Sequence, residues 1–337
     1  MFLRQTSYNK IVNMKDIISE LKKYKLLGRS GSCFPTGLKW EIVKNYKADK
    51  KYIICNGSEG DPANFKDGFI LRNYPEKVIE GIKIALETID NSSAYIYLRK
   101  DYFKEFGEKL KNLSLNFPIT LFEKKGGYLA GEETVVCEVI EGKRPEPRLK
   151  PPFPAEAGLW GYPTLVNNVE TFYAVAKIGD ATYEKKRFYS ISGDIEKSGV
   201  YELPENWSVR KILEETGNLP GFDFFVQIGG GAAGEILLSE ELNRQIEGMA
   251  TIIVFDAKKT EPFALMKKWT DFFLKENCDK CTPCREGAFR INELVEKKEI
   301  DEKILKDIFF VLENTSFCPL GKGMAVPFRS LVNKLLK

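Results

Sequence analysis

Hydrophobic positions along the chain recur at two spacings, one typical of helices and one typical of strands. In residues 14–27 apolar side chains recur every three or four positions, which predicts a helix that ends at the glycine-rich segment 28–37. Runs of consecutive apolar residues at 51–55, 94–98 and 119–122 predict buried strands, and helical patterns lie between them. Strands that alternate with helices in this way are typical of an α/β domain with a parallel sheet.

The pattern changes after residue 185. Short β-rich runs at 188–192, 199–203, 224–228 and 251–255 surround one helical segment at 208–215, which together predict a small β-grasp (ubiquitin-like) unit. From residue 261 onward every pattern is helical, and a bundle of four short antiparallel helices is the simplest arrangement. The predicted domains are therefore 1–185, 186–257 and 258–337.

Length and charge exclude several classes of protein. A chain of 337 residues predicts about two domains, or three small ones. Its 51 basic and 48 acidic residues give a net charge of +3, which is too balanced for a nucleic-acid-binding surface. No apolar run approaches the roughly 18 residues that a membrane helix needs. We therefore expect no nucleic-acid partner and no direct membrane span.

The chain contains no histidine. This absence excludes Ser-His-Asp and Cys-His nucleophilic sites, zinc sites that use histidine, Rieske clusters and histidine-ligated haem. Any chemistry therefore has to come from carboxylates, lysine, arginine, cysteine or a bound cofactor.

Four of the seven cysteines have the spacing of a metal site. Cys278, Cys281 and Cys284 form a C-x2-C-x2-C motif, and Cys318, followed by proline, lies on a separate helix connection. Three thiolates on so tight a turn, with a fourth from elsewhere, favour a [4Fe-4S] cluster. A zinc site with four thiolates is the alternative, although zinc ribbons usually pair two separate C-x2-C hooks.

The other cysteines, Cys33, Cys55 and Cys137, lie far from this motif. We expect each to be a small buried hydrophobic residue, with Cys33 also a candidate ligand contact because it lies in the glycine-rich segment. An odd number of cysteines, and first residues without the apolar core of a secretory signal, favour a reducing cytoplasm. Grouped cysteines in that compartment bind metal more often than they form disulfides.

Two polar segments are candidate ligand sites. The glycine-rich segment opens a helix on which Lys39 lies about half a turn after Gly37, so loop amides, the helix N-terminus and the ammonium can converge on one phosphate. A solvated helix face would carry a lysine equally well. The polar cluster 56–61 follows the strand at 51–55, at the edge where open α/β sheets bind ligands, and a solvated turn is the alternative.

Several long motifs precede the cysteine motif in a fixed order, and together they resemble a known family. The chain is similar to the NADH-binding flavoprotein (51 kDa-type) subunit of respiratory complex I and to its relatives in NAD-linked hydrogenases and formate dehydrogenases. The resemblance extends from Gly28 to Cys318. The motifs that carry it are 28–40, Phe65-Lys66-Asp67, Gly131-Glu132-Glu133-Thr134, 148–154, 158–161 and Asn167-Asn168-Val169-Glu170-Thr171.

The resemblance implies a Rossmann-like domain that holds FMN, a β-grasp domain and a helical bundle that carries one [4Fe-4S] cluster. It also implies an NADH:acceptor oxidoreductase, in which NADH passes hydride to FMN and electrons leave singly through the cluster. Positions that match the family's FMN contacts are Gly28, Arg29, Ser30, Gly31, Lys39, Asn56, Asn167 and Asn168. Positions that match its NADH pocket are Glu59, Glu132, Glu133, Lys150 and Phe153.

The chain departs from the family pattern at two places in the cofactor site. Ser30, Ser32 and Cys33 bring side chains into the glycine loop, where the backbone normally approaches the flavin. Ser58, which we also expect to contact the cofactor, stands where relatives commonly have an Asp. We expect these changes to affect flavin affinity and the preference for NADH, which the paired glutamates favour by accepting ribose hydroxyls and repelling a 2′-phosphate.

The resemblance also implies partner proteins. A thioredoxin-like [2Fe-2S] subunit and a larger iron-sulfur subunit of a multi-subunit complex are the expected electron acceptors. We expect a cytoplasmic location, with any attachment to the inner face of the membrane made through those partners. Two alternatives stay open: the same module in a soluble or electron-bifurcating hydrogenase or formate dehydrogenase, and a zinc-bearing scaffold without activity.

Overall fold

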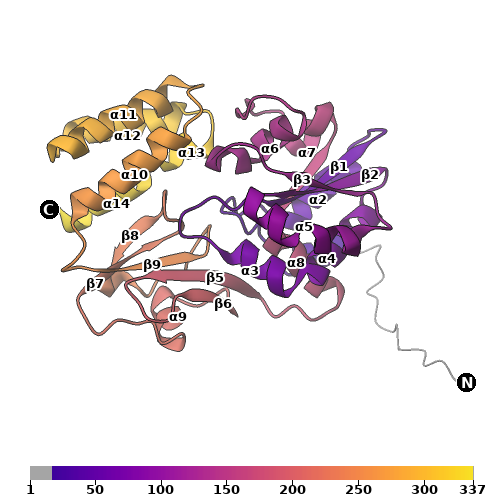
Figure 1. The fold of residues 1–337 in the computed structure, drawn as a ribbon, viewed down its shortest axis with the longest axis horizontal. Helices are drawn as coiled ribbons and strands as arrows, with labels where there is room; N and C mark the ends of the chain where they lie inside the picture. Colours follow the sequence, from indigo (N-terminus) through magenta and orange to yellow (C-terminus); the bar gives the residue numbers. More distant parts are fainter. Residues whose placement is uncertain (1–16, 337) are drawn as a thin grey trace, which may run out of the picture.

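Four parallel strands form the first sheet of the computed structural model, which describes residues 17–336 (Figure 1). The strands confirm those predicted at 51–55, 94–98 and 119–122. Residues 14–16 of the predicted first helix, and the first residues that bear on a secretory signal, lie outside the described part of the chain. The sheet has the order β3-β2-β1-β4, with β1 at Lys51–Gly57, β2 at Ser92–Leu98, β3 at Ile119–Glu123 and β4 at Thr164–Asn168.

Alternate residues of β1 face two different hydrophobic cores, as the two-residue period of a strand requires. Ile53 and Cys55 pack into the first core and Tyr52 and Ile54 into the second, where α6 (Glu133–Ile140) lies. The helices of the first core are α1 (Ile17–Lys23), α2 (Thr36–Asn45), α3 (Lys66–Asn73), α4 (Pro75–Thr88), α5 (Lys100–Ser114) and α8 (Val169–Gly179). Short helical turns complete this part: η2 (Tyr128–Gly131), α7 (Pro154–Ala157) and η3 (Leu159–Gly161).

A mixed five-stranded sheet follows, with the order β6-β5-β9-β7-β8 and a core of its own. Only the β5–β9 pair is parallel among these neighbours. The sequence pattern missed β8, because four residues are too few to show a strand period. The elements are β5 (Lys186–Gly193), β6 (Gly199–Pro204), α9 (Val209–Glu215), β7 (Phe224–Ile228), β8 (Glu235–Leu238), η4 (Ser239–Glu241) and β9 (Thr251–Asp256).

The C-terminal region is helical and shares its core with the first sheet. Trp269, Phe273 and Phe328 belong to the same cluster of buried residues as Ile54 and Val135. A fifth, short helix, α13, adds to the four that were predicted. The helices are α10 (Pro262–Glu276), α11 (Thr282–Lys297), α12 (Glu302–Thr315), α13 (Pro319–Gly323) and α14 (Ala325–Leu335). Within residues 17–336, no helix has the length and apolar character needed to cross a bilayer.

Candidate functional site

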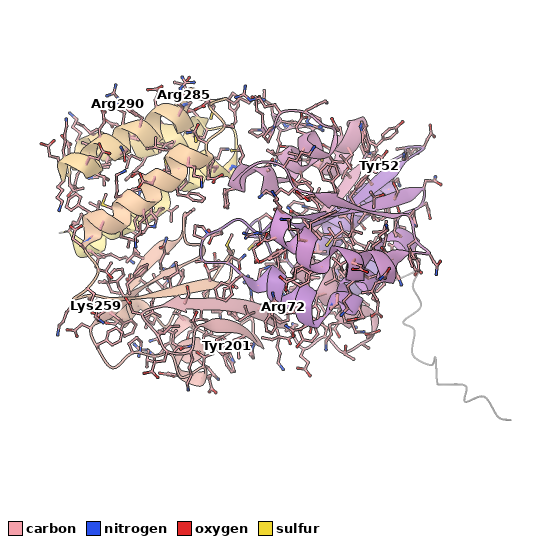
Figure 2. All side chains as sticks on the ribbon, in the orientation of Figure 1. Tyr52, Arg72, Tyr201, Lys259, Arg285 and Arg290 are labelled. Carbon is pink, nitrogen blue, oxygen red and sulfur yellow. The ribbon has the colours of Figure 1, made fainter. Side chains whose placement is uncertain are left out.

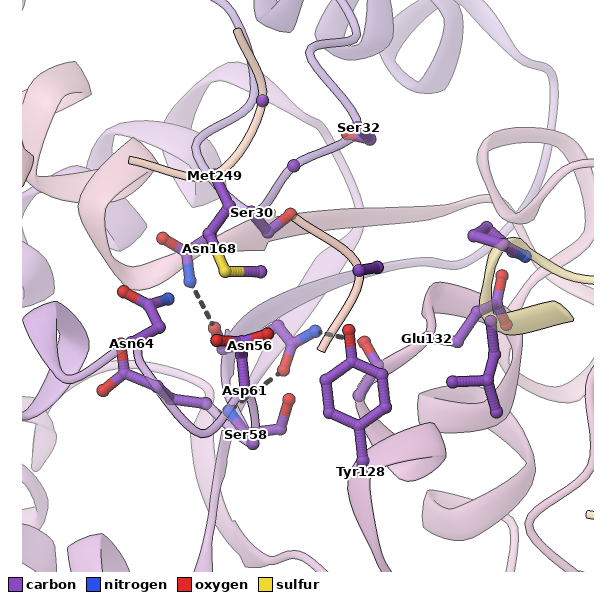
Figure 3. A pocket seen from close by; sticks show the side chains of 18 of the residues that line it. Ser30, Ser32, Asn56, Ser58, Asp61, Asn64, Tyr128, Glu132, Asn168 and Met249 are labelled. Carbon is purple, nitrogen blue, oxygen red and sulfur yellow. Dashed lines mark hydrogen bonds between the residues drawn. The ribbon is translucent and has the colours of Figure 1, made fainter. Parts of the chain in front are cut away.

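A cavity of about 450 Å³ is lined by residues from the two sheets' connecting loops and from the C-terminal helices (Figure 3). Its volume falls in the range of roughly 300–1,000 Å³ that is usual for small-molecule and cofactor sites. The first domain contributes 10 of the 14 residues expected to bind cofactor or NADH: Ser30, Gly31, Lys39, Asn56, Ser58, Glu59, Glu132, Glu133, Lys150 and Asn168. The cavity also opens at the carboxyl end of the parallel sheet, where open α/β sheets bind ligands.

The glycine-rich segment forms an irregular loop between α1 and α2. The Gly28 N–H donates to the Phe34 carbonyl at 2.9 Å, and the Thr36 N–H donates to the Leu26 carbonyl at 2.8 Å. Gly31 has φ +105°, a conformation that L side chains rarely adopt, and Cys33 has φ +50°. Ser30, Gly31 and Ser32 line the cavity, whereas Cys33 is not among its lining residues.

Two lysines and two glutamates form a charged cluster on the cavity wall. The Lys150 ammonium lies 2.7 Å from the Glu132 carboxylate and 2.8 Å from that of Glu133, and the Lys39 ammonium lies 3.3 Å from Glu133. Burial alone would raise the pKa of Glu133, but the two ammonium groups outweigh it and hold this pKa below its usual value. Glu133 is therefore a carboxylate at neutral pH, and the cluster carries no net charge.

Glu132 also has a structural role. It precedes α6, and its side-chain carboxylate accepts hydrogen bonds from the Thr134 N–H at 2.8 Å and the Val135 N–H at 3.1 Å. These bonds satisfy amides that the first turn of a helix leaves unpaired. Glu132 thus caps a helix in addition to pairing with Lys150. The Glu133 carboxylate forms ion pairs with Lys39 and Lys150.

Asparagine side chains at the ends of β1 and β4 fix the floor of the cavity. The Asn56 amide donates to the Gly131 carbonyl at 2.9 Å, and the Asn56 side-chain oxygen accepts the Ser58 N–H at 3.1 Å (Figure 3). The Asn168 amide donates to the Asp67 carboxylate at 2.6 Å. Asn167 is turned away, because its side-chain oxygen accepts the Trp40 indole N–H at 2.9 Å, and it does not line the cavity.

The Glu59 carboxylate lies at the N-terminus of α3. It accepts the N–H groups of Asp67 at 2.9 Å and Gly68 at 3.2 Å, and the Tyr102 hydroxyl at 2.6 Å. Burial is the largest cause that raises the pKa of Glu59 to about 7, and the neighbouring Asp67 carboxylate adds to the shift. Glu59 lines the cavity, but its carboxylate oxygens are already hydrogen-bonded within the protein.

Three other expected contacts do not line the cavity: Gly28, Arg29 and Phe153. The buried Arg29 guanidinium donates to the Glu205 carboxylate at 2.6 Å and to the Tyr183 hydroxyl at 2.7 Å, so its side chain ties the glycine loop to the second sheet. Phe153 is half exposed, with the Lys150 ammonium 5.9 Å from its ring centre. The sequence could not show that the Arg29 side chain points away from the cavity, because its hydrogen-bond partners lie more than 150 residues further along the chain.

Much of the cavity wall comes from segments that the sequence did not single out as contacts. The second sheet contributes the loop after β7 and the segment before β9, and the C-terminal region contributes aromatic and apolar side chains. A glycine cluster directly after a strand, 229–234, was the available signal for the first of these. The lining residues from these two regions are Gly229, Ala232, Ala233, Glu247, Gly248, Met249, Phe272, Phe273, Pro319 and Leu320.

The four cysteines of the predicted metal site line a second, smaller cavity. Cys281 immediately precedes α11 and Cys318 immediately precedes α13, so helix N-terminal amides face this cavity. Burial and the neighbouring thiols raise the pKa of Cys284 to about 12, so metal binding has to displace the thiol proton. In residues 17–336, no three Cys, His, Asp or Glu side chains converge as ligands of a single metal ion.

Four cysteine thiols that line one cavity are the donor set of a [4Fe-4S] cluster, with one cysteine for each iron. Four thiolates also suit a tetrahedral zinc ion. Leu320 is the side chain that lines both this cavity and the larger one.

Comparison with known proteins gives consistent results. The Nuo51 FMN-binding domain matches residues 21–177, and the NADH-ubiquinone oxidoreductase-F iron-sulfur binding region matches residues 264–335. An NADH-quinone oxidoreductase subunit of Rhizobium meliloti is 34% identical over 365 residues, covering 94% of this chain and 86% of its own. NADP-reducing hydrogenase subunit HndC of Solidesulfovibrio fructosivorans is 31% identical, covering 94% of this chain and 74% of its own.

A solved structure shows the same architecture. An NAD+-reducing [NiFe]-hydrogenase in the H2-reduced state superposes with a TM-score of 0.87 at 29% sequence identity, over 95% of this chain. The chain spans 61% of the hydrogenase chain that it matches.

Proposed function

Because this chain belongs to the family of the FMN-binding and [4Fe-4S]-binding (51 kDa-type) subunit of NADH-quinone oxidoreductase, we propose that its larger cavity holds FMN beside NADH. The chain is an NADH-oxidising subunit whose cofactors are FMN and a [4Fe-4S] cluster. The observation that carries the placement of both groups is Leu320, which lines the larger cavity and the cysteine cavity at once. A flavin and a cluster in these two cavities would both lie next to Leu320.

When bound, FMN accepts hydride from NADH and releases electrons one at a time, and the cluster accepts single electrons. The chain's own residues bind and orient the reactants. We assign the backbone of Ser30, Gly31 and Ser32, with Lys39, to the FMN phosphate, because these four residues line the same cavity and offer amides and an ammonium. Asn56 and Asn168 hold the floor in place through their own hydrogen bonds.

NADH is assigned to the wall that carries the charged cluster. Lys150 is placed to meet a phosphate, and Glu133, a carboxylate without a capping role, is placed to accept ribose hydroxyls. Phe34 and Phe153 do not line the cavity, but each exposed ring has the ammonium of a lining lysine within 6 Å of its centre, and the two rings offer faces for the adenine.

Buried apolar side chains keep water from the space between the two cavities. Phe273 is 1% exposed and Leu320 is 8% exposed, and both line the larger cavity. A dry environment strengthens electrostatic interactions and excludes side reactions of a reduced cofactor. No protein general base is required for hydride transfer, which agrees with a chain that contains no histidine.

The three-domain division follows from the same assignments. We propose that residues 1–185 form the Rossmann-like FMN and NADH domain, 186–257 a β-grasp domain, and 258–337 a four-helix bundle with one additional short helix. The change from a parallel to a mixed sheet between β4 and β5, and the start of α10 after β9, support these boundaries.

Electrons must leave to partner subunits, and the cysteine cavity indicates where. Cys278 is partly exposed, and Phe317, which also lines this cavity, is 43% exposed. Arg285 and Arg290 extend outward from α11 (Figure 2). We propose that a thioredoxin-like [2Fe-2S] subunit and a larger iron-sulfur subunit accept the electrons, and that the complex lies in the cytoplasm, where only the partners would contact the membrane.

A second assembly has support from the comparisons. The identity to the hydrogenase subunit HndC, 31%, is close to the 34% found for the Rhizobium meliloti protein. The same module in a hydrogenase complex would use the same cavity and cysteines. The two assemblies differ in their partner subunits, so co-purification from the native source and identification of the bound partners distinguishes them.

The test of the proposed function is the visible spectrum of anaerobically purified protein. We expect flavin bands and broad iron-sulfur absorbance, with both bleached by NADH. Cys284→Ser should lose iron while it retains flavin that NADH still reduces. Cys137→Ser is the matched control, since the Cys137 thiol only donates to the Glu133 carbonyl at 3.4 Å, a bond that serine can also make. A colourless protein that contains zinc would refute the assignment in favour of a scaffold.

A further inference from the structure

The second sheet reaches the larger cavity through two segments. The loop 229–234 follows β7, and Glu247, Gly248 and Met249 precede β9; both segments contribute to the cavity lining. Figure 3 shows Met249 and Ser30 among the side chains around the cavity. A Cβ atom on Gly248 would lie 3.6 Å from the Gly31 carbonyl, so the segment before β9 lies next to the glycine loop.

A buried carboxylate of the first domain holds the loop 229–234 in place. Asp61 is 6% exposed, and its Oδ1 accepts the Gly231 N–H at 2.7 Å while its Oδ2 accepts the Ala232 N–H at 3.4 Å. Oδ1 also accepts the Ala63 N–H, at 3.0 Å. Burial raises the pKa of Asp61, and these three amides oppose that shift. Successive amides that face one carboxylate form an anion-binding nest, and Asp61 fills it.

The approach of the two domains here is too close for larger residues. A Cβ atom on Gly230, whose φ is +127°, would lie 2.9 Å from the Asp61 carboxylate, and one on Gly231 would lie 3.0 Å from Ala63. On the other side of the loop, the buried Gln227 amide donates to the Gly231 and Gly234 carbonyls, each at 3.3 Å. The loop is therefore held from both sides.

We propose that Asp61 is a positioning residue that fastens the loop 229–234 against the flavin cavity, so that the second sheet supplies one wall of the FMN site. The inference rests on the assignment of FMN to this cavity and extends it to a domain outside the matched FMN-binding region, 21–177. Apart from glycines, the residues that this wall presents to the cavity are Ala232, Ala233, Glu247 and Met249.

The test compares Asp61→Asn with Asp61→Glu and Asp194→Asn in the full chain. Asp194 is a matched control, because its carboxylate accepts the Asp256 N–H at 2.8 Å in the same sheet but does not line the cavity. FMN binding to flavin-depleted protein is followed by fluorescence quenching. Hydrogen exchange of the Gly231 and Ala232 amides reports on the loop without any cofactor.

We expect Asp61→Asn to bind FMN about tenfold more weakly, since charge-assisted hydrogen bonds are lost, and to exchange the two amides faster. Asp61→Glu, which keeps the carboxylate, should restore most of the affinity. Asp194→Asn should bind FMN like the wild type. Met249→Ala should weaken FMN binding and leave exchange at Gly231 and Ala232 unchanged, because it removes a wall atom without releasing the loop.

Two outcomes would overturn the proposal. If Asp61→Asn speeds amide exchange but binds FMN with unchanged affinity, the second sheet is not part of the FMN site. If the amide exchange is unchanged, the carboxylate does not hold the loop. Failure of the wild-type chain to bind FMN would instead refute the proposed function, so the two failures are distinguishable.

Discussion

The Lys150 ammonium lies 2.8 Å from the Glu133 carboxylate, and this pair connects the segment 148–154 to the start of α6. Lys39 approaches the same carboxylate from α2 at 3.3 Å. One carboxylate thus holds two ammonium groups from distant parts of the chain at the wall assigned to NADH. The choice between NADH and NADPH should depend on how far the Glu133 carboxylate neutralises these two ammonium groups.

Glu133→Gln should reduce the preference for NADH. Loss of the carboxylate leaves Lys39 and Lys150 with less counter-charge, so a 2′-phosphate meets less repulsion and more attraction. We expect the ratio of kcat/KM for NADH to that for NADPH to fall about tenfold, which corresponds to roughly 1.4 kcal/mol. The measurement is ferricyanide reduction with each nucleotide.

Glu132→Gln is the companion variant. It shares Lys150 with Glu133 but also caps α6, so we expect a loss of about 1 kcal/mol in the free energy of unfolding, whereas Glu133→Gln should change stability less. An unchanged nucleotide preference in Glu133→Gln would show that this carboxylate does not face the ribose.

Stability should depend on pH through Glu59. Its pKa is about 7 in the folded chain against an ordinary value of 4.5, so between these values the folded state binds a proton that the unfolded state releases. The free energy of unfolding should therefore fall as pH rises through this window. In Glu59→Gln this contribution is absent.

Urea unfolding at pH 5, 6, 7 and 8 checks the prediction. The free energy of unfolding of the wild type should fall relative to that of Glu59→Gln as pH increases. Glu214→Gln, at an exposed carboxylate on α9, serves as the control and should follow the wild type. Parallel curves for the wild type and Glu59→Gln would contradict a raised pKa at this site.

Local patterns predicted much of this molecule. Strand β1 appears in the sequence as a run of apolar residues, because it is buried on both faces. The cysteine spacing predicted a shared site for Cys278, Cys281, Cys284 and Cys318, and these residues do line one cavity. Such features depend on residues that are close in the sequence or on chemistry that few residue types can supply.

Features that depend on distant contacts were not predictable in the same way. Asn167 and Arg29 belong to motifs of the resemblance, yet Asn167 pairs with Trp40 and Arg29 with Glu205, so neither side chain lines the cavity. The wall from the second sheet depends on Asp61 meeting Gly231, which is 170 residues away. No local spacing carries that information.

Removing Glu205 should destabilise the fold more than removing Arg29. The Arg29 side chain is 4% exposed, whereas that of Glu205 is 30% exposed. Glu205→Ala takes the hydrogen-bonded carboxylate away from a buried cation and leaves only the charge of Glu170 and the Tyr183 hydroxyl to compensate it, which costs about 1.5–3 kcal/mol. Arg29→Met leaves a carboxylate that water can reach, so its cost should be smaller.

Urea unfolding and FMN titration together test this assignment. Both variants should lose less FMN affinity than Lys39→Ala, because the Arg29 side chain points away from the cavity and acts on FMN only through the glycine loop. Lys39→Ala, by contrast, should weaken FMN binding with little loss of stability. A large loss of FMN affinity in Glu205→Ala, at unchanged stability, would contradict a purely structural role for the pair.

Leu320 should control the environment of the iron-sulfur cluster. Leu320→Ala removes side-chain volume between the two cavities and lets water approach the cysteines. Because reduction adds negative charge to the cluster, and water stabilises that charge, we expect the midpoint potential of the cluster to rise. Potentiometric titration followed by EPR measures this potential directly.

Leu312→Ala is the control, since Leu312 is fully buried against Gly287 in the same helical region and lines neither cavity. Both variants should lose stability, by about 2–5 kcal/mol, but only Leu320→Ala should shift the potential. Equal potentials in the two variants would mean that Leu320 does not separate the cluster from the flavin cavity.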